Sequence, residues 1–286
     1  MAAGSPGVRR IVATRRLAVL GSPIGHSRSP ALHRAAYDVL GLDWSYEAAD
    51  VAGSELAAFV EGRDESWLGL SLTMPLKRDI LPLLSSRNAL VDQTGSANTV
   101  LFTPGGLAGF NTDVYGITGA FARHGVDSLR TVLVVGGGAT AASALVAAAR
   151  LGAHRVFIAV RSVERAAPIV GVGRAQGIEV DLIPLTSVAT LDERLDAVIS
   201  TVPNGTDAVV EFDRDTVVTA TLLDVAYHPW PSPLAQGWSG AGTISGLEML
   251  VLQALAQVRI FVNHDDAVAV ADEDRVLAAM LESVGL

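Results

Sequence analysis

Two ionisable residues of this chain could together handle a proton. The stretch SLTMPLKRD contains Lys77, the only lysine, whereas the other 20 of the 21 basic residues are arginine. An ammonium group can lose its proton when desolvated and a guanidinium effectively cannot, so Lys77 suits general acid–base chemistry. Asp113, in GFNTD, is a carboxylate that could orient such an amine. Taken alone, each has a simpler interpretation, as a surface lysine and a loop carboxylate.

The segment VLVVGGGATAA could bind the phosphates of a dinucleotide. Gly136, Gly138 and Ala141 match the pattern G-x-G-x-x-A between an expected strand and an expected helix. In this pattern the glycines allow a tight turn and a close backbone approach to the pyrophosphate, which lies at the N-terminus of the helix. A plain glycine turn is the alternative, but the context of strand, loop, helix and strand favours a cofactor site.

The strand after this loop ends in cations. NAD sites usually have an acidic residue about 20 residues beyond the loop, which binds the ribose 2′-OH. Here the strand ends at Val160, followed by Arg161 and Ser162, with Arg165 one turn later. Two guanidinium groups and a hydroxyl suit a 2′-phosphate, so the sequence predicts NADP rather than NAD. A solvated helix start is the alternative.

Two hydroxyls stand at the entry to a predicted helix in GSPIGHSRSP. Ser27 and Ser29, with the free N–H groups of the helix, could hold a carboxylate. Capping by Ser29 is the simpler interpretation. His26 and His33 have no third ligand in sight, so we predict no metal site.

Composition excludes several classes of protein. The formal net charge of -9 comes with no basic patch for a nucleic-acid backbone and no basic amphipathic helix for a membrane surface. The absence of cysteine excludes disulfides and thiolate metal sites and fits a reducing cytosol. The uncharged run 131–149 approaches membrane-span length, but its glycine turn indicates a strand, a loop and a helix.

Alternating strands and helices must position these groups. We predict strands at 16–21, 44–50, 67–73, 131–135, 154–160, 194–202 and 219–227, helices at 29–41, 53–62, 139–152, 246–262 and 265–285, helix or turns at 75–84, and a hairpin at 99–113. In the helix 29–41, Ser29 is expected as the N-cap, Pro30 at the first helical position and Gly41 as the C-cap. Such alternation predicts an α/β fold with right-handed βαβ units and a parallel sheet. The last two helices either cover that sheet or return to the first domain.

Eight motifs in order resemble shikimate dehydrogenases. They are VLGSPIGHSRSPALH, LSLTMPLK, GSANTV, GFNTD, VVGGGATA, VRSVERA, DVAYHPWPSPL and ISGLEMLVLQA, and they extend from Arg16 nearly to the end of the chain. The resemblance implies a substrate-binding domain (residues 1–112 and 247–286) and an inserted Rossmann-type NADP domain (113–246). Residues 1–14 are expected to form a loose leader.

The resemblance also implies roles for individual residues. The catalytic pair would be Lys77 and Asp113; the substrate-binding residues Ser27, Ser29, Thr73, Asn98, Tyr227 and Gln253; and the cofactor-binding residues Gly136, Gly137, Gly138, Ala139, Thr140, Ala141, Arg161, Ser162, Arg165 and Gly246. The two serines, assisted by Tyr227, would bind the substrate carboxylate, while Thr73, Asn98 and Gln253 would bind ring hydroxyls.

The implied reaction is the reversible, NADPH-dependent reduction of 3-dehydroshikimate to shikimate. Lys77 and Asp113 would give acid–base assistance, and the resemblance leaves open which of the two moves the proton. The enzyme is expected to be a cytoplasmic monomer or homodimer that binds neither nucleic acid nor membrane. The chain departs from the family pattern in places: Ser71 stands where many members have asparagine, and Val114, Ser245 and Glu248 also differ. A quinate/shikimate or aminoshikimate dehydrogenase, an idle NADP-binding protein and a folate-linked dehydrogenase are the alternatives. The paired serines favour the shikimate type over the folate-linked one.

Overall fold

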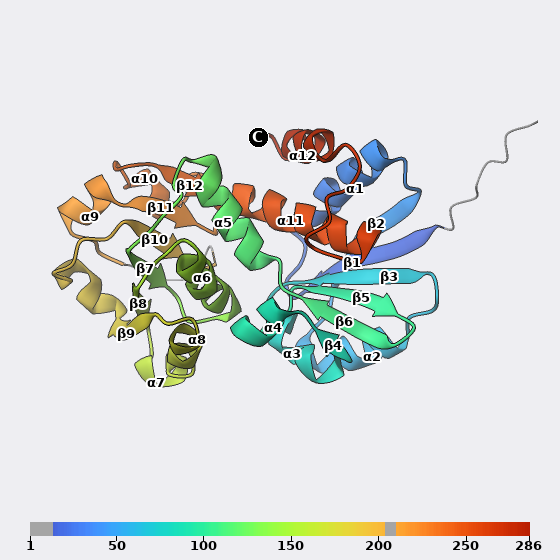
Figure 1. Ribbon diagram of the computed structural model, residues 1–286, viewed down its shortest axis with the longest axis horizontal. Helices are drawn as coiled ribbons and strands as arrows, with labels where there is room; N and C mark the ends of the chain where they lie inside the picture. The colour runs from blue at the N-terminus through green and yellow to red at the C-terminus, as the bar shows by residue number, and fades with distance from the viewer. Residues whose placement is uncertain (1–13, 204–209) are drawn as a thin grey trace, which may run out of the picture.

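Two six-stranded sheets lie side by side in this chain and are connected by long helices (Figure 1). The computed structural model describes residues 14–203 and 210–286. Of the predicted leader, residues 1–13 lie outside the described residues. The predicted α/β class is confirmed.

The first sheet is mixed, with the strand order β2-β1-β3-β5-β6-β4. Its strands are β1 (Arg15–Gly21), β2 (Trp44–Asp50), β3 (Trp67–Leu72), β4 (Ser86–Arg87), β5 (Thr99–Thr103) and β6 (Gly106–Phe110). β1 is parallel to β2 and β3, whereas β5 is antiparallel to β3 and β6. The predicted hairpin is thus β5–β6, and its turn places Gly106 at a φ of 106°, which favours glycine.

The helices of the first sheet lie where the sequence predicts them, except that α4 was not predicted and one cap differs. They are α1 (Ser29–Leu40), α2 (Leu56–Glu61), α3 (Leu76–Asp79) and α4 (Ala89–Thr94), with 3-10 turns at Gly53–Glu55 and Leu81–Leu83. Gly41 ends α1 in the left-handed conformation, as predicted. The predicted N-cap is wrong, because Arg28 occupies that position and Ser29 is already helical.

The second sheet is entirely parallel, with the strand order β12-β11-β10-β7-β8-β9. Its strands are β7 (Thr131–Val135), β8 (Arg155–Val160), β9 (Glu179–Pro184), β10 (Ala197–Ser200), β11 (Thr221–Asp224) and β12 (Thr243–Ser245). This is the 3-2-1-4-5-6 order of dinucleotide-binding folds, in which the direction of winding reverses between β7 and β10. Ligands bind at this point, outside the carboxyl ends of the strands.

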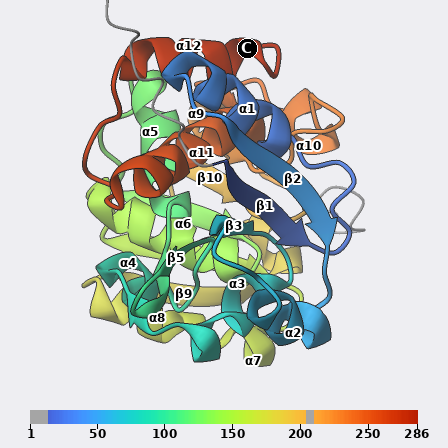
Figure 2. The same ribbon diagram turned by 90° about the vertical axis from the view of Figure 1, so that its right-hand side faces the viewer.

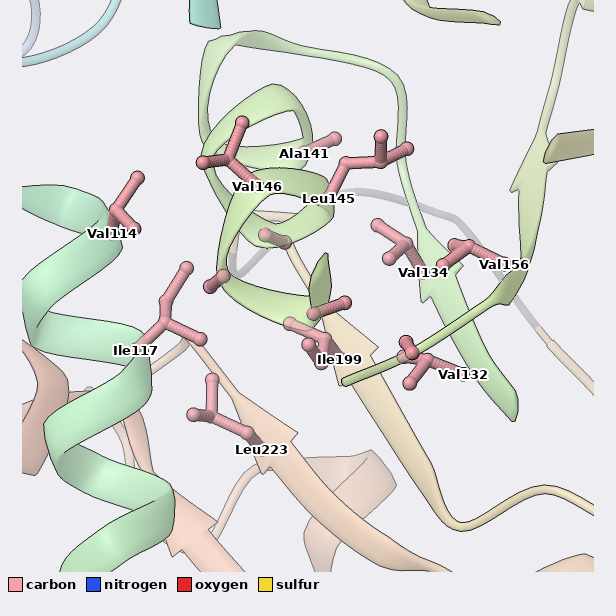
Figure 3. Packing of buried hydrophobic residues seen from close by; sticks show 14 of the residues in the cluster. Val114, Ile117, Val132, Val134, Ala141, Leu145, Val146, Val156, Ile199 and Leu223 are labelled. Atoms are coloured by element: carbon pink, nitrogen blue, oxygen red, sulfur yellow. The ribbon is translucent and has the colours of Figure 1, made fainter. Parts of the chain in front are cut away.

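Helices cover both faces of the second sheet. They are α5 (Asp113–Arg123), α6 (Ala139–Arg150), α7 (Val163–Ala166), α8 (Ile169–Ala175), α9 (Arg214–Thr219) and α10 (Pro233–Gln236), with a 3-10 helix at Leu185–Thr190. On one face, Val132 and Val134 pack with Leu145 of α6 and Ile117 of α5 (Figure 3). On the other, Leu133 and its neighbours pack in a separate cluster. The uncharged run 131–149 is therefore a buried strand, a loop and a buried helix, as predicted.

The last two helices, α11 (Gly246–Asn263) and α12 (Glu273–Glu282), return to the first domain. They lie beside α1 (Figures 1 and 2), and Val251, Leu255 and Val258 of α11 share a core with Leu17 of β1 and Leu32 of α1. Among the described residues, α11 is the one helix long and apolar enough to cross a membrane by length and composition. In this fold 67% of it is buried by the rest of the molecule, as expected for a core helix.

The packing of α5 against α11 brings the two domains together at Gly116. A Cβ at Gly116 would lie 2.7 Å from the Met249 carbonyl oxygen and 2.9 Å from the Gln253 Cβ. We expect Gly116→Ala to lower the free energy of unfolding by about 1–3 kcal/mol, because the helices must move apart to admit the methyl group. Urea denaturation measures this change.

Gly171, inside α8, provides the matched control. A Cβ added there has no atom within 4 Å, so Gly171→Ala should leave stability unchanged or raise it by about 0.5–1 kcal/mol through helix propensity. A Gly116→Ala variant as stable as Gly171→Ala would contradict the close contact between α5 and α11.

Candidate active site

A cavity of about 930 Å³ opens between the two domains at the point where the winding of the second sheet reverses. Its second-domain wall includes the glycine loop after β7, Arg161 after β8, Thr201 after β10 and Tyr227 after β11. The first domain contributes Thr73 and Lys77, among others. Of the predicted cofactor residues, Gly136 to Thr140 and Arg161 line this cavity.

The glycine loop has the geometry that its sequence predicts for a dinucleotide. Gly136 turns the chain at a φ of 109°, and a Cβ there would lie 2.5 Å from the Thr201 Oγ1. Gly138 is the N-cap of α6, and a Cβ there has no atom within 4 Å, so the backbone is open to a ligand. Ala141 is fully buried and lets α6 pack on the sheet. The residues present therefore fit a pyrophosphate at the N-terminus of α6.

The three predicted 2′-phosphate ligands differ in position. Among the described lining residues of the large cavity, Arg161 is the only one of the three. Ser162 is the N-cap of α7, where its hydroxyl accepts a bond from the Arg165 N–H at 3.4 Å. Gly246, predicted with the cofactor residues, instead lines a second cavity.

The second cavity, of about 260 Å³, gathers residues that are far apart in the sequence. All eight predicted catalytic and substrate residues line it: Ser27, Ser29, Thr73, Lys77, Asn98, Asp113, Tyr227 and Gln253. They come from the loop before α1 and α1 itself, from the ends of β3 and β11, from α3, from the start of α5, from α11 and from the residue before β5. The volume suits a small ring rather than a dinucleotide.

Lys77 and Asp113 form an ion pair on the wall of this cavity. The Lys77 Nζ donates to the Asp113 Oδ2 at 2.5 Å, and the two side chains are 14% and 4% exposed. Leu76 and Ile80, both fully buried, anchor the short helix that carries Lys77. Asp113 begins α5, where a carboxylate is also stabilised by the helix dipole.

Asn98 holds the other carboxylate oxygen of the pair. Its Nδ2 lies 2.9 Å from both the Asp113 Oδ1 and the Thr112 Oγ1 and 3.1 Å from the Gln253 Oε1, and its two protons are shared among these three acceptors. The Asn98 Oδ1 accepts from the Thr112 N–H at 2.9 Å. Asn98 thus orients Asp113, and its predicted contact with a ring hydroxyl stays a prediction.

The predicted carboxylate site lies at one side of the cavity. Ser29 is 5% exposed in the first turn of α1, and its N–H donates to the Ser27 Oγ at 3.4 Å. Burial raises the pKa of Tyr227 above its ordinary value, and the positive charge of Arg28 partly offsets this effect. Tyr227 therefore stays a neutral phenol that can donate a hydrogen bond.

The motifs did not reveal several polar residues of the cavity. Gln257 lines it beside Ser71, and Tyr46 of β2 contacts Ser71 from behind. Gln257 lies four residues after Gln253 in α11, so helical spacing could have indicated it. Tyr46 gave no such signal, because only the pairing of β2 with β1, next to β3, brings it near.

The two cavities share Lys77, Thr73, His26, Thr140, Val225 and Tyr227. A dinucleotide loop therefore opens onto the same space as an ion-paired lysine in a small polar cavity. Together with the sheet order, this arrangement defines a two-domain dehydrogenase of the dinucleotide-binding class.

Comparison with known proteins identifies the family. The sequence-family model described as the shikimate dehydrogenase substrate binding domain matches residues 19–100. The shikimate dehydrogenase (NADP(+)) of Geobacter metallireducens is 34% identical, over 93% of this chain and 97% of that protein. The pentafunctional AROM polypeptide of Yarrowia lipolytica is 33% identical over 85% of this chain, and the match covers 16% of that longer protein.

Solved structures agree. The Mycobacterium tuberculosis shikimate dehydrogenase shares 36% identity and a TM-score of 0.79, over 94% of this chain and 99% of that one. The Thermus thermophilus enzyme, solved in complex with NADP(H) and shikimate, shares 26% identity and a TM-score of 0.77, over 94% and 100% of the two chains. The chain belongs to the shikimate dehydrogenase family.

Proposed function

We propose that this chain is an NADP-dependent shikimate dehydrogenase, which interconverts 3-dehydroshikimate and shikimate. The observation that carries the proposal is the Lys77–Asp113 pair, at the place where a small polar cavity meets the cavity of the glycine loop. Family membership and the activities named for the relatives support it.

In this proposal the small cavity holds the substrate ring. Ser27, Ser29 and Tyr227 bind its carboxylate with hydroxyl donors, and Thr73 and Gln253 face its hydroxyls. The carboxylate side and the Lys77 side of the cavity then fix the orientation of the ring, because each presents a different set of donors.

The reacting carbonyl lies beside Lys77. NADPH, held by the glycine loop and Arg161, would supply a hydride to the C3 carbonyl carbon. The Lys77 Nζ donates a proton to the carbonyl oxygen, and takes one back from the C3 hydroxyl in the reverse direction. Asp113 orients the ammonium group through its Oδ2 and is itself held by Asn98 through its Oδ1.

Steady-state rates with two substrates and two cofactors test the proposal. We expect shikimate to be oxidised in preference to quinate, and NADP to be reduced in preference to NAD. A higher kcat/KM with quinate would make the chain a quinate/shikimate dehydrogenase, and absence of turnover with either substrate would make it an idle homologue.

Arg161 should determine the choice of cofactor. We expect Arg161→Ala to raise the KM for NADPH by about 10- to 100-fold, because a charge-assisted contact with the 2′-phosphate is lost, while the KM for NADH stays unchanged. Arg174→Ala removes an exposed arginine of α8 in the same domain and serves as the control. An equal loss of affinity for both cofactors, or a preference of the wild type for NAD, would contradict this role.

We also propose that the domains are divided as the sequence predicts, into 1–112 with 247–286 and 113–246, and that the protein acts in the cytoplasm as a monomer or homodimer. The distribution of β1–β6 and β7–β12 between two sheets supports the division. Light scattering of the purified protein measures the oligomeric state.

A further inference from the structure

Ser71 occupies a wall of the small cavity with most of its hydrogen-bonding capacity already used. It is 3% exposed, accepts a bond from the Tyr46 hydroxyl at 2.6 Å, and donates to the Gln257 Oε1 at 2.9 Å. A hydroxyl has one donor and two acceptor positions. With its proton committed to Gln257, Ser71 has one acceptor position left.

The orientation of the Gln257 amide is fixed by its partners. The Gln257 Nε2 donates to the Thr99 Oγ1 at 3.0 Å and to the backbone oxygen of Asn98 at 3.3 Å. The Asn98 carbonyl can only accept, so a flipped amide would set two acceptors against each other. The Oε1 must therefore face Ser71.

His33 supports the same arrangement from the far side. Its Nε2 lies 3.1 Å from the Gln257 Oε1, and its Nδ1 lies 3.1 Å from the Tyr37 hydroxyl. Burial lowers the pKa of His33 to about 3, with the Gln257 contact partly opposing this, so the ring is neutral and carries one N–H. Because the Oε1 can only accept, that proton sits on Nε2. The ring also stacks on Tyr46, with centroids 3.9 Å apart.

We propose that Gln257 is a positioning residue that makes Ser71 a hydrogen-bond acceptor only, and that this wall selects a ring substituent that donates a hydrogen bond. The inference rests on the proposed function, because it takes the small cavity as the site of the substrate ring. A hydroxyl or an amine suits the wall, whereas a carbonyl would set lone pair against lone pair. The ring carbonyl is thereby turned away from Ser71 and toward the Lys77 donor.

Fluorinated substrates test this selection. Replacing the C4 or the C5 hydroxyl of shikimate with fluorine nearly keeps its size but removes the donor. We expect the wild type to lose about 10- to 100-fold in kcat/KM with the analogue that faces Ser71, because the buried acceptor is left unsatisfied. Ser71→Ala should abolish this discrimination, since the hydroxyl that would accept from the substrate is removed.

Two variants at Gln257 separate positioning from packing. In Gln257→Met the side chain cannot accept the Ser71 proton, so the Ser71 hydroxyl is free to turn toward the fluorine. The ratio of kcat/KM for shikimate to kcat/KM for the analogue should then fall by about threefold or more. Gln257→Glu is the matched control: its protonated carboxyl group donates to the Asn98 backbone oxygen with one oxygen and accepts from Ser71 with the other, so the discrimination should persist. Thermal melting verifies that each variant folds; if Gln257→Met does not fold, the Ser71→Ala comparison decides.

Equal use of shikimate and both analogues by the wild type would overturn the inference. So would undiminished discrimination in Ser71→Ala or in folded Gln257→Met. Failure of the wild type to oxidise shikimate at all would overturn the proposed function, and the inference with it. Oxidation of shikimate without discrimination overturns the inference alone.

Discussion

Lys77→Ala should lower kcat by about 10²- to 10⁴-fold, because the variant has no group that can exchange a proton with the C3 oxygen. The KM for NADPH should change little, since the glycine loop and Arg161 lie on the other domain. Steady-state kinetics in both directions, with nicotinamide absorbance as the signal, separate the two parameters. Near-wild-type turnover in Lys77→Ala would remove Lys77 from the mechanism.

Lys77→Arg is the sharper variant. It keeps the positive charge beside Asp113 but replaces an amine that can lose its proton with a guanidinium that effectively cannot. We expect a loss of kcat in the same range as for alanine. Full activity in Lys77→Arg would show that the position supplies charge alone and that the proton is handled elsewhere.

Asp113→Asn is the second variant with a large expected effect. Both carboxylate oxygens of Asp113 receive donors, Lys77 at Oδ2 and Asn98 at Oδ1. An asparagine has one acceptor oxygen and one NH2 group, so one of these two donors would face another donor. We expect kcat to fall on the order of 10²-fold or more, with the KM for NADPH again nearly unchanged.

The matched control for this change is Asp92→Asn. Asp92 is an exposed carboxylate of α4, so the same loss of charge there should leave kcat unchanged. The double variant Lys77→Ala/Asp113→Asn should be little slower than Lys77→Ala, because residues that act as one unit are not additive. Independent, multiplying effects would contradict the paired role.

Local patterns in the sequence predicted much of this fold. Two strands were predicted from the apolar runs TVLVV (β7) and HRVFIAV (β8), because buried parallel strands are apolar throughout. The glycine turn after TVLVV predicted the loop between β7 and the next helix. The short strand β12 and the edge strand β9 were missed, since Thr243–Ser245 and the half-exposed Glu179–Pro184 lack a clear apolar run. The capping prediction for Ser29 failed because Arg28 already has helical backbone angles.

The site was predictable where a motif carried it. The Lys77 and Asp113 motifs and the glycine loop were identified, and the structure brings them together at adjoining cavities. The network behind Ser71 was not predictable, because Tyr46, His33 and Gln257 come from three different elements. Their contacts arise only when β2 pairs with β1 and α11 returns to the first domain.

The most direct test of this account is the absorbance of the nicotinamide band when purified protein is mixed with shikimate and NADP. We predict steady reduction of NADP by the wild type, much slower reduction with NAD, and almost none by Lys77→Ala or Lys77→Arg. A wild type that leaves the absorbance unchanged, or a Lys77→Arg variant as fast as the wild type, would contradict a dehydrogenase whose proton is moved by Lys77.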